Sequence, residues 1–210
     1  CFDNIDDLID AVDVVDIVTP TLSHYDCAKK AISKGKHIFI EKPITNTVEE
    51  AEHIRELLAK HNLRGQVGHV ERFNPAFLAV KDKLENPMFI ETHRLAEFNP
   101  RGTDVPVVLD LMIHDIDIIL NFVRSEIVNI HAAGIHVISE HVDIANARLE
   151  FKSGCIANVT ASRISTKNER KIRLFQKDTY ISVDFANQGI TVIQRDDKVE
   201  GGLIPGMEIK

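Results

Sequence analysis

Four polar side chains in this 210-residue chain have the types and spacings that proton transfer requires. Lys42 follows the strand-like run 37–40 and precedes a proline, so it lies just past a strand end, where open α/β sheets bind their ligands. Asp110, His114 and Asp117 stand at steps of four and three, which places them on one face of a predicted helix. A histidine one turn from a carboxylate can be held in one tautomer, as a general base needs. The alternatives are a solvated surface lysine and a helix-surface ion pair.

A strand-to-helix loop near the start of the chain could bind a phosphate or a ribose. It contains Thr19, Pro20 and, near the helix start, His24. The N-terminus of a helix offers free backbone N–H groups, which favour anions. A plain turn capped by Thr21 or Ser23 is the alternative interpretation.

Two further groups of polar residues could position a substrate. The run 68–75 places His69, Arg72 and Asn74 at the end of a predicted strand, although a domain hinge has a similar composition. Arg163 lies on a predicted strand and could bind a phosphate or a carboxylate in bidentate fashion if its face is open; otherwise it is a solvated residue on a sheet face. No second histidine stands at a compact ligand spacing around the polar helix, so we expect no metal there.

The first 70 residues alternate strand-like and helix-like segments, which is typical of βαβ units in a parallel sheet. Gly35 indicates where one helix ends, and Thr47 followed by Glu50 has the spacing of a helix capping box. We expect strands at 12–18, 37–40 and 64–68, and helices at 22–34 and from Thr47 onward.

The pattern changes after residue 74. Apolar residues recur at steps of three and four over 109–123 and predict an amphipathic helix. From Ile127 onward, β-rich segments follow one another across short turns, as antiparallel strands do. The other expected elements are a helix from 75 to about 84, a strand at 89–95, and a loop or ragged end over the last ten residues. We place the domain boundary near residue 72.

The composition is that of a soluble globular chain, with 44% apolar and 27% charged residues. The 25 basic residues are outnumbered by 32 acidic ones, so no basic field is available to hold nucleic acid or an anionic membrane. Charged side chains interrupt the longest apolar region, 105–123, which argues against a membrane span. Three cysteines without close pairing indicate neither a disulfide framework nor a zinc site, and they fit a reducing cytoplasm.

The motifs together are more specific than any one of them. In order along the chain they are Thr19-Pro20 with His24, Glu41-Lys42-Pro43, Arg72-Phe73-Asn74-Pro75, and Asp110-x-x-x-His114-Asp115-x-Asp117. Their order and spacing resemble the Gfo/Idh/MocA family over residues 1 to about 200, and the second and fourth motifs form the specific signature. The resemblance implies an α/β Rossmann-type parallel sheet in residues 1–72, incomplete at its N-terminus, which binds a dinucleotide. It also implies an α+β domain in residues 73–210, whose open, mostly antiparallel sheet serves substrate binding and oligomerisation.

The resemblance also implies an activity, the reversible oxidation of a sugar or polyol hydroxyl with NAD or NADP. Lys42 matches the family's active-site lysine, while Asp110 and His114 match the aspartate and histidine of its catalytic helix. The run 68–75 looks most like the branch that acts on nucleotide-linked amino sugars, such as UDP-N-acetylglucosamine 3-dehydrogenases. We expect cofactor contacts from Thr19, Pro20, His24, Glu41, Lys42, Pro43 and His69, and substrate contacts from Arg72, Asn74, Asp117 and Arg163.

One departure from the family pattern concerns the glycine-rich turn G-x-G-x-x-G, which holds the dinucleotide pyrophosphate on a helix N-terminus. The sequence contains no such glycine cluster. We expect the chain to begin inside the Rossmann domain, with the glycine-rich segment missing from this sequence; the other interpretation is that the protein has lost it. The acidic residue that would bind the adenosine ribose is missing with it, so the sequence does not distinguish NAD from NADP.

Oxidation of a secondary alcohol needs a base for the hydroxyl proton. We expect His114 to take it, with Asp110 orienting the ring and Lys42 hydrogen-bonding the developing alkoxide, or His114 and Lys42 to exchange these roles. The alternative function is a non-catalytic dinucleotide- or sugar-binding regulatory protein of the same fold. A purely structural dimerisation module would leave the polar helix face unexplained. An open sheet face predicts a homodimer or homotetramer.

Overall fold

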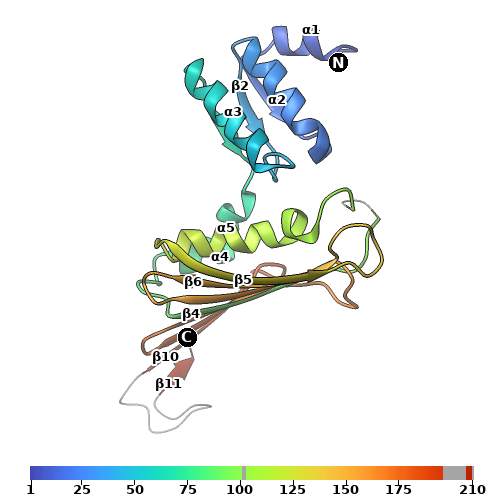
Figure 1. Ribbon diagram of the computed structural model, residues 1–210. Helices are drawn as coiled ribbons and strands as arrows, with labels where there is room; N and C mark the ends of the chain where they lie inside the picture. Colours follow the sequence, from blue (N-terminus) through green and yellow to red (C-terminus); the bar gives the residue numbers. More distant parts are fainter. Residues whose placement is uncertain (101–102, 196–206, 210) are drawn as a thin grey trace. The chain divides into compact units, whose positions relative to one another are not determined.

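The computed structural model describes residues 1–100, 103–195 and 207–209. The chain divides into two compact units, Cys1–His69 and Val70–Lys210, which we call the N-terminal unit and the C-terminal unit (Figure 1). None of the described helices is long and apolar enough to cross a membrane.

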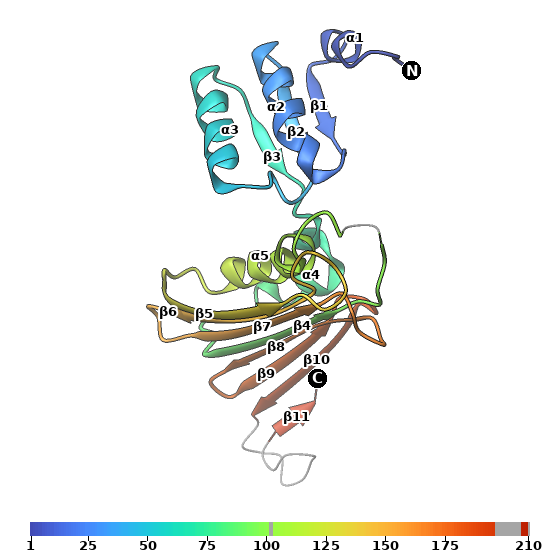
Figure 2. The ribbon, with the colours of Figure 1, turned by 45° about the vertical axis from the view of Figure 1, so that its right-hand side comes forward.

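A parallel sheet of three strands, in the order β1-β2-β3, forms the centre of the N-terminal unit. Figure 2 shows these strands beside the helices α2 and α3. Both strand pairs are parallel, which confirms the predicted βαβ organisation. The elements are α1 (Ile5–Asp10), β1 (Val14–Ile17), the 3-10 turn η1 (Thr21–Ser23), α2 (His24–Ser33), β2 (His37–Ile40), α3 (Val48–Lys60) and β3 (Gly65–Val67).

Local signals explain where two of these helices begin and end. The Thr47 side chain accepts a hydrogen bond from the Glu50 N–H at 3.3 Å and so caps the start of α3. Gly35, with φ of +72°, follows α2 in the left-handed conformation that glycine adopts without strain. Both positions agree with the sequence predictions. The core between helices and sheet consists of Ile9, Val15, Ile17, Ala28, Ala31, Ile32, Ile38, Ile40 and Ile54.

The C-terminal unit contains an eight-stranded sheet, in the order β11-β10-β9-β8-β4-β7-β6-β5. β4 and β7 run parallel, and the other described neighbours pair antiparallel, which confirms the predicted open, mostly antiparallel sheet. The strands are β4 (Phe89–Leu95), β5 (Ile127–Ile135), β6 (Ile144–Phe151), β7 (Ile156–Ser162), β8 (Glu169–Gln176), β9 (Thr179–Asp184), β10 (Gly189–Arg195) and β11 (Met207–Ile209). The helical elements are η2 (Val70–Phe73), α4 (Pro75–Lys81), η3 (Val108–Met112) and α5 (Ile113–Phe122).

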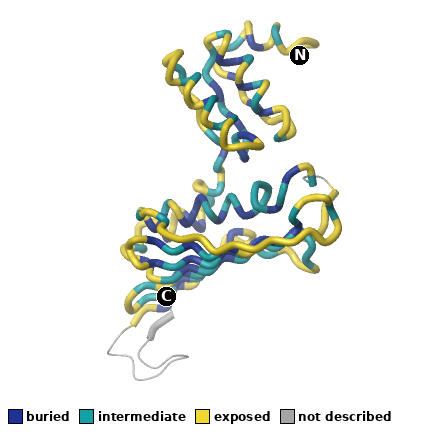
Figure 3. Tube along the Cα trace, viewed as in Figure 1, coloured by how far each residue is buried: buried dark blue, intermediate teal, exposed yellow. Residues whose placement is uncertain are grey.

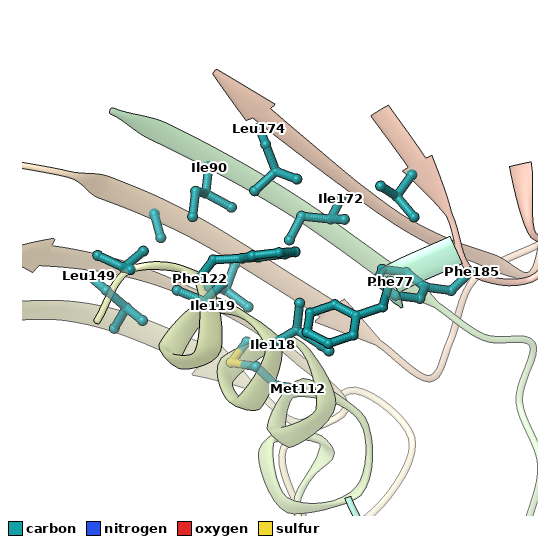
Figure 4. Packing of buried hydrophobic residues seen from close by; sticks show 14 of the residues in the cluster. Phe77, Ile90, Met112, Ile118, Ile119, Phe122, Leu149, Ile172, Leu174 and Phe185 are labelled. Atoms are coloured by element: carbon teal, nitrogen blue, oxygen red, sulfur yellow. The ribbon is translucent and has the colours of Figure 1, made fainter. Parts of the chain in front are cut away.

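Helices α4 and α5 pack on one face of this sheet (Figure 2). The rings of Phe77 and Phe122, one from each helix, have centroids 5.1 Å apart. Alternate strand residues face the helices: on β4, Ile90 is fully buried while Phe89 and Glu91 on either side are only half-buried. Figure 4 shows this core, which also contains Met112, Ile118, Ile119, Leu149, Ile172, Leu174 and Phe185.

The helix predicted over 109–123 begins in an unexpected way. η3 is a π-helical turn, whose backbone hydrogen bonds join residues five apart and whose turn is therefore wider than an α-helical one. Asp110 lies in this wider turn, whereas His114 and Asp117 lie in α5. The predicted helix therefore starts with a π-helical turn, and the shared face of Asp110, His114 and Asp117 stays a prediction.

The end of the chain also differs from the prediction. Met207–Ile209, predicted as loop or ragged end, forms a short strand that pairs antiparallel with β10 and sets Ile209 opposite Ile193. This strand forms because it pairs with β10, and that pairing cannot be predicted from the local sequence, which is rich in glycine and proline. The other residues of that prediction, 201–206 and 210, lie outside the described residues.

Candidate active site

The three strands of the N-terminal unit end at the same edge of their sheet. Beyond the strands, the Glu41 N–H donates to the Ile17 carbonyl at 3.0 Å, and the Gly68 N–H donates to the Ile40 carbonyl at 2.8 Å. The residues that follow the three strands are therefore held beside one another. Lys42 follows the middle strand, so its backbone lies at the edge where open α/β sheets bind ligands.

A glycine at this edge leaves room for a carboxylate. A Cβ built on Gly68 would lie 3.0 Å from Oε1 of Glu41, so the Glu41 side chain lies directly against the end of β3. The same carboxylate accepts a hydrogen bond from the Lys42 N–H at 3.2 Å. The peptide bond between Lys42 and Pro43 is cis.

His24 has a different role from the direct cofactor contact that the sequence suggested. Its side chain is 1% exposed. Nδ1 lies 2.9 Å from the carbonyl oxygen of Pro43, and Nε2 lies 2.8 Å from that of Thr19. Both ring nitrogens are therefore bound to backbone within the unit. The cofactor contacts expected of Thr19, Pro20, Glu41, Lys42, Pro43 and His69 stay predictions.

In the C-terminal unit, two predicted substrate contacts bind each other. The Arg72 guanidinium donates from Nε to Oδ2 of Asp117 at 2.8 Å and makes a second, very short bond from Nη2 to Oδ1. This bidentate hydrogen bonding raises the pKa of Arg72. Asp117 is buried, whereas the Arg72 side chain is 46% exposed. Arg72 thus keeps a solvent-facing side, while Asp117 mainly orients it.

Directly after His114, a buried ion pair joins α5 to the sheet. The Asp115 carboxylate accepts from Nη2 and Nε of Arg94, on β4, at 2.9 and 3.1 Å. Burial alone would lower the pKa of Arg94, but the charges and hydrogen bonds of Asp115 and Glu71 together outweigh it, and the pKa is raised. Nη1 of Arg94 lies 3.4 Å from Oε1 of Glu71, so the same guanidinium also reaches the segment before α4.

Asn74, another expected substrate contact, is used within the fold. Its Oδ1 accepts the Ala76 N–H at 3.0 Å and so caps the start of α4. Its Nδ2 donates to Oε2 of Glu71 at 3.2 Å and to the carbonyl of Phe185 at 3.3 Å. Both ends of the amide are therefore occupied by contacts within the C-terminal unit.

Arg163 does not have the open sheet face on which its predicted role depended. The residue is 4% exposed, and Nη2 donates to the carbonyl of Val105 at 2.6 Å and to that of Val142 at 3.4 Å. Its Nε lies 3.8 Å from Oδ1 of Asp143. The arginine therefore holds the segment that leads into η3, and direct substrate binding by its guanidinium is not supported.

Asp143, the partner of Arg163, is itself enclosed. It accepts hydrogen bonds from the N–H groups of Val137, Ile138 and Ser139, at 2.8, 2.8 and 3.0 Å, and from the Ser139 hydroxyl at 2.6 Å. Burial alone would raise the pKa of Asp143, but these hydrogen bonds lower it far below its ordinary value.

The supporting residues Arg94, Glu71 and Asp143 were missed by reasoning from sequence. Arg94 could have been found from the sequence. Every second side chain of β4 is buried, and Arg94 is one of these, two residues after Thr92 and four after Ile90. A charged residue in that phase needs a buried partner. Within the residues that the structure describes, no group of three or more His, Cys, Asp or Glu side chains is arranged to hold a metal ion.

Comparison with known proteins assigns both units to one family. The family model described as "Oxidoreductase family, NAD-binding Rossmann fold" matches residues 1–69. A second model, "GFO/IDH/MocA C-terminal domain", matches residues 57–182.

Two relatives show how far the similarity extends. The chain is 36% identical over 207 residues to the UDP-N-acetylglucosamine 3-dehydrogenase of Acidithiobacillus ferrooxidans. This alignment covers 98% of this chain and 65% of the relative. It is 31% identical over 165 residues to the scyllo-inositol 2-dehydrogenase (NAD(+)) of Bacillus subtilis, covering 71% of the chain and 48% of the relative. The chain thus spans between about half and two thirds of the length of these relatives.

Comparison with solved structures agrees with this family assignment. The UDP-N-acetylglucosamine 3-dehydrogenase from Acidithiobacillus ferrooxidans superposes with a TM-score of 0.92 at 36% identity, covering 100% of this chain and 67% of that one. A levoglucosan dehydrogenase in complex with NADH and levoglucosan shares the fold, with a TM-score of 0.86 at 20% identity and coverage of 100% and 64%. The chain belongs to the Gfo/Idh/MocA family of oxidoreductases.

Proposed function

We propose that the protein transfers a hydride between a hydroxyl-bearing carbon of a nucleotide-linked sugar and a nicotinamide dinucleotide. The observation that carries the proposal is 36% identity to a UDP-N-acetylglucosamine 3-dehydrogenase across 98% of the chain. Lys42, Asp110 and His114 are present together, which supports catalysis over binding alone.

The ends of β1, β2 and β3 fit one part of a dinucleotide site. Gly68 leaves the space there that the Glu41 carboxylate occupies. Thr19, Pro20, Glu41, Lys42, Pro43 and His69 would hold the cofactor, and the nicotinamide, when bound, supplies a hydride acceptor. The glycine-rich turn that receives a pyrophosphate is not among these 210 residues.

His114 is the proposed base. Its ring takes the hydroxyl proton, Asp110 orients the ring, and the Lys42 ammonium donates a hydrogen bond to the oxygen as negative charge develops there. The opposite assignment, with Lys42 as the base, uses the same groups. The Arg94–Asp115 pair fixes the helix start that carries His114, so the ring needs little reorganisation during the reaction.

Arg72 is the proposed contact for a phosphate of the nucleotide sugar. Its guanidinium is held in place by Asp117 and still has an exposed side. Arginine suits this role because its planar fork can bind phosphate through two hydrogen bonds. Asn74 and Arg163 support the site indirectly, since their polar atoms bind neighbouring backbone and side chains.

The exposed part of the C-terminal sheet supports a homodimer or homotetramer. Figure 3 shows β5 exposed along its length, and this edge strand carries the apolar side chains of Val128, Ile130 and Ile135. Exposed apolar side chains grouped on a strand are typical of protein contacts. Sedimentation of the protein at several concentrations tests this part of the proposal.

The function is tested by combining the full-length protein with NAD or NADP and a panel of nucleotide sugars, and by following nicotinamide absorbance. We expect turnover with a UDP-linked N-acetylamino sugar and none with the free nucleotide. Saturable dinucleotide binding without turnover on any sugar would instead support the regulatory alternative. Absence of dinucleotide binding would contradict both.

A further inference from the structure

The buried ring of His24 lies between two groups that can only accept hydrogen bonds. Each ring nitrogen is within 3 Å of a backbone carbonyl oxygen, that of Pro43 or that of Thr19. A neutral imidazole has one N–H and one lone pair, so it can donate to only one of these oxygens. Whichever nitrogen carries the proton, both ring nitrogens lie against backbone oxygens of the unit.

The two carbonyls belong to loops that follow adjacent strands. Thr19 stands two residues after the end of β1, and Pro43 stands three residues after the end of β2. Pro43 also follows Lys42 directly. One side chain on α2 thus joins the two loops at the carboxyl edge of the sheet, next to the lysine.

We propose that His24 is a positioning residue that holds the two loops of the dinucleotide site, and with them Lys42, through the contacts of its two ring nitrogens. The consequence for cofactor binding rests on the proposed function; the contacts of the ring with the two loops do not.

The ring can be examined directly in the unmodified chain. Nitrogen-15 NMR of the histidine rings should show slow exchange of the His24 ring N–H, because the ring is enclosed and bound to backbone on both sides. Exchange as fast as that of the exposed His61 ring would overturn the proposal. This measurement needs no ligand and no variant.

Two variants test the positioning role. His24→Gln keeps a single amide donor and places an oxygen toward the second carbonyl, whereas His61→Gln makes the same change at an exposed residue that follows α3. In the full-length protein, His24→Gln should weaken NADH binding about tenfold and speed hydrogen exchange in residues 19–23 and 41–45. His61→Gln should change neither.

The outcomes separate this proposal from the proposed function. Unchanged loop exchange and unchanged NADH affinity in a folded His24→Gln variant would refute the positioning role. If the unmodified protein binds no NADH at all, the proposed function fails, and the NMR and exchange results still decide the role of His24. Equal acceleration of exchange over the whole N-terminal unit would mean a general loss of stability and would also count against positioning.

Discussion

Arg94 and Asp115 form a bidentate ion pair inside the C-terminal unit, with Nη2–Oδ1 and Nε–Oδ2 distances of 2.9 and 3.1 Å and both residues 3% exposed. Arg94 lies on the central strand β4, and Asp115 immediately follows His114 on α5. The pair therefore ties the first turn of the helix, with its candidate base, to the middle of the sheet.

Breaking this pair should destabilise the protein strongly. Asp115→Asn or Arg94→Met leaves one charged or polar group buried without its partner, which costs about 3–5 kcal/mol. Glu126→Gln is the matched control, because its ion pair with Lys152 is exposed and contributes about 0–1 kcal/mol. Urea unfolding measures the three changes. A loss for Asp115→Asn no larger than for the control would contradict the role given to the pair.

Stability should fall at acid pH through Asp143. Hydrogen bonds lower the pKa of this carboxyl in the folded state below its ordinary value of 3.8. Its contribution is therefore fully present above about pH 4 and is lost progressively as the pH falls toward the folded-state pKa. Asp143→Asn should remove this part of the acid dependence, as seen in unfolding curves between neutral and strongly acid pH. A variant that keeps the whole acid dependence of the unmodified protein would refute the assignment.

Cys1 and Cys155 should differ sharply in reactivity. Burial raises the pKa of the Cys155 thiol to about 11, whereas Cys1 is exposed. Because the thiolate is the reactive form, iodoacetamide at about pH 8 should modify Cys1 first and Cys155 only after unfolding. Mass spectrometry of timed samples measures the order. Early modification of Cys155 in the folded chain would show that its surroundings open.

A methyl group at Gly68 should disturb the edge of the parallel sheet. The Cβ of Gly68→Ala would come within 3.0 Å of the Glu41 carboxylate, which must then move. Gly189→Ala is the control, since its Cβ would meet nothing closer than 3.9 Å. Titration with NADH should show affinity a few-fold weaker, about 1 kcal/mol, for Gly68→Ala alone. Equal affinities would remove Glu41 from the proposed cofactor site.

Local patterns predicted the elements well because the relevant forces act over a few residues. β2 was predicted at its observed bounds, His37–Ile40, and Thr47 was predicted as the cap of α3. The π-helical turn at Asp110 was not predicted, because the apolar spacing of 109–123 is equally typical of an unbroken α-helix.

The partners of polar side chains were harder to predict. Asp117 was placed beside Asp110 and His114, but it binds Arg72, 45 residues earlier in the chain. Arg163 reaches Val105, 58 residues away. Such pairings depend on how distant elements pack, so the sequence indicated which residues are polar and not which of them remain open to a substrate.

The most direct test of the proposed chemistry is single-turnover hydride transfer in the full-length protein, with a nucleotide sugar that supports turnover. His114→Ala and Lys42→Ala should each slow the transfer by about 10²- to 10⁴-fold while the proteins stay folded. Lys60→Ala, at the last residue of α3, should leave the rate unchanged. Near-normal transfer by His114→Ala would contradict the assignment of His114 as the base, and near-normal transfer by both variants would contradict the proposed active site.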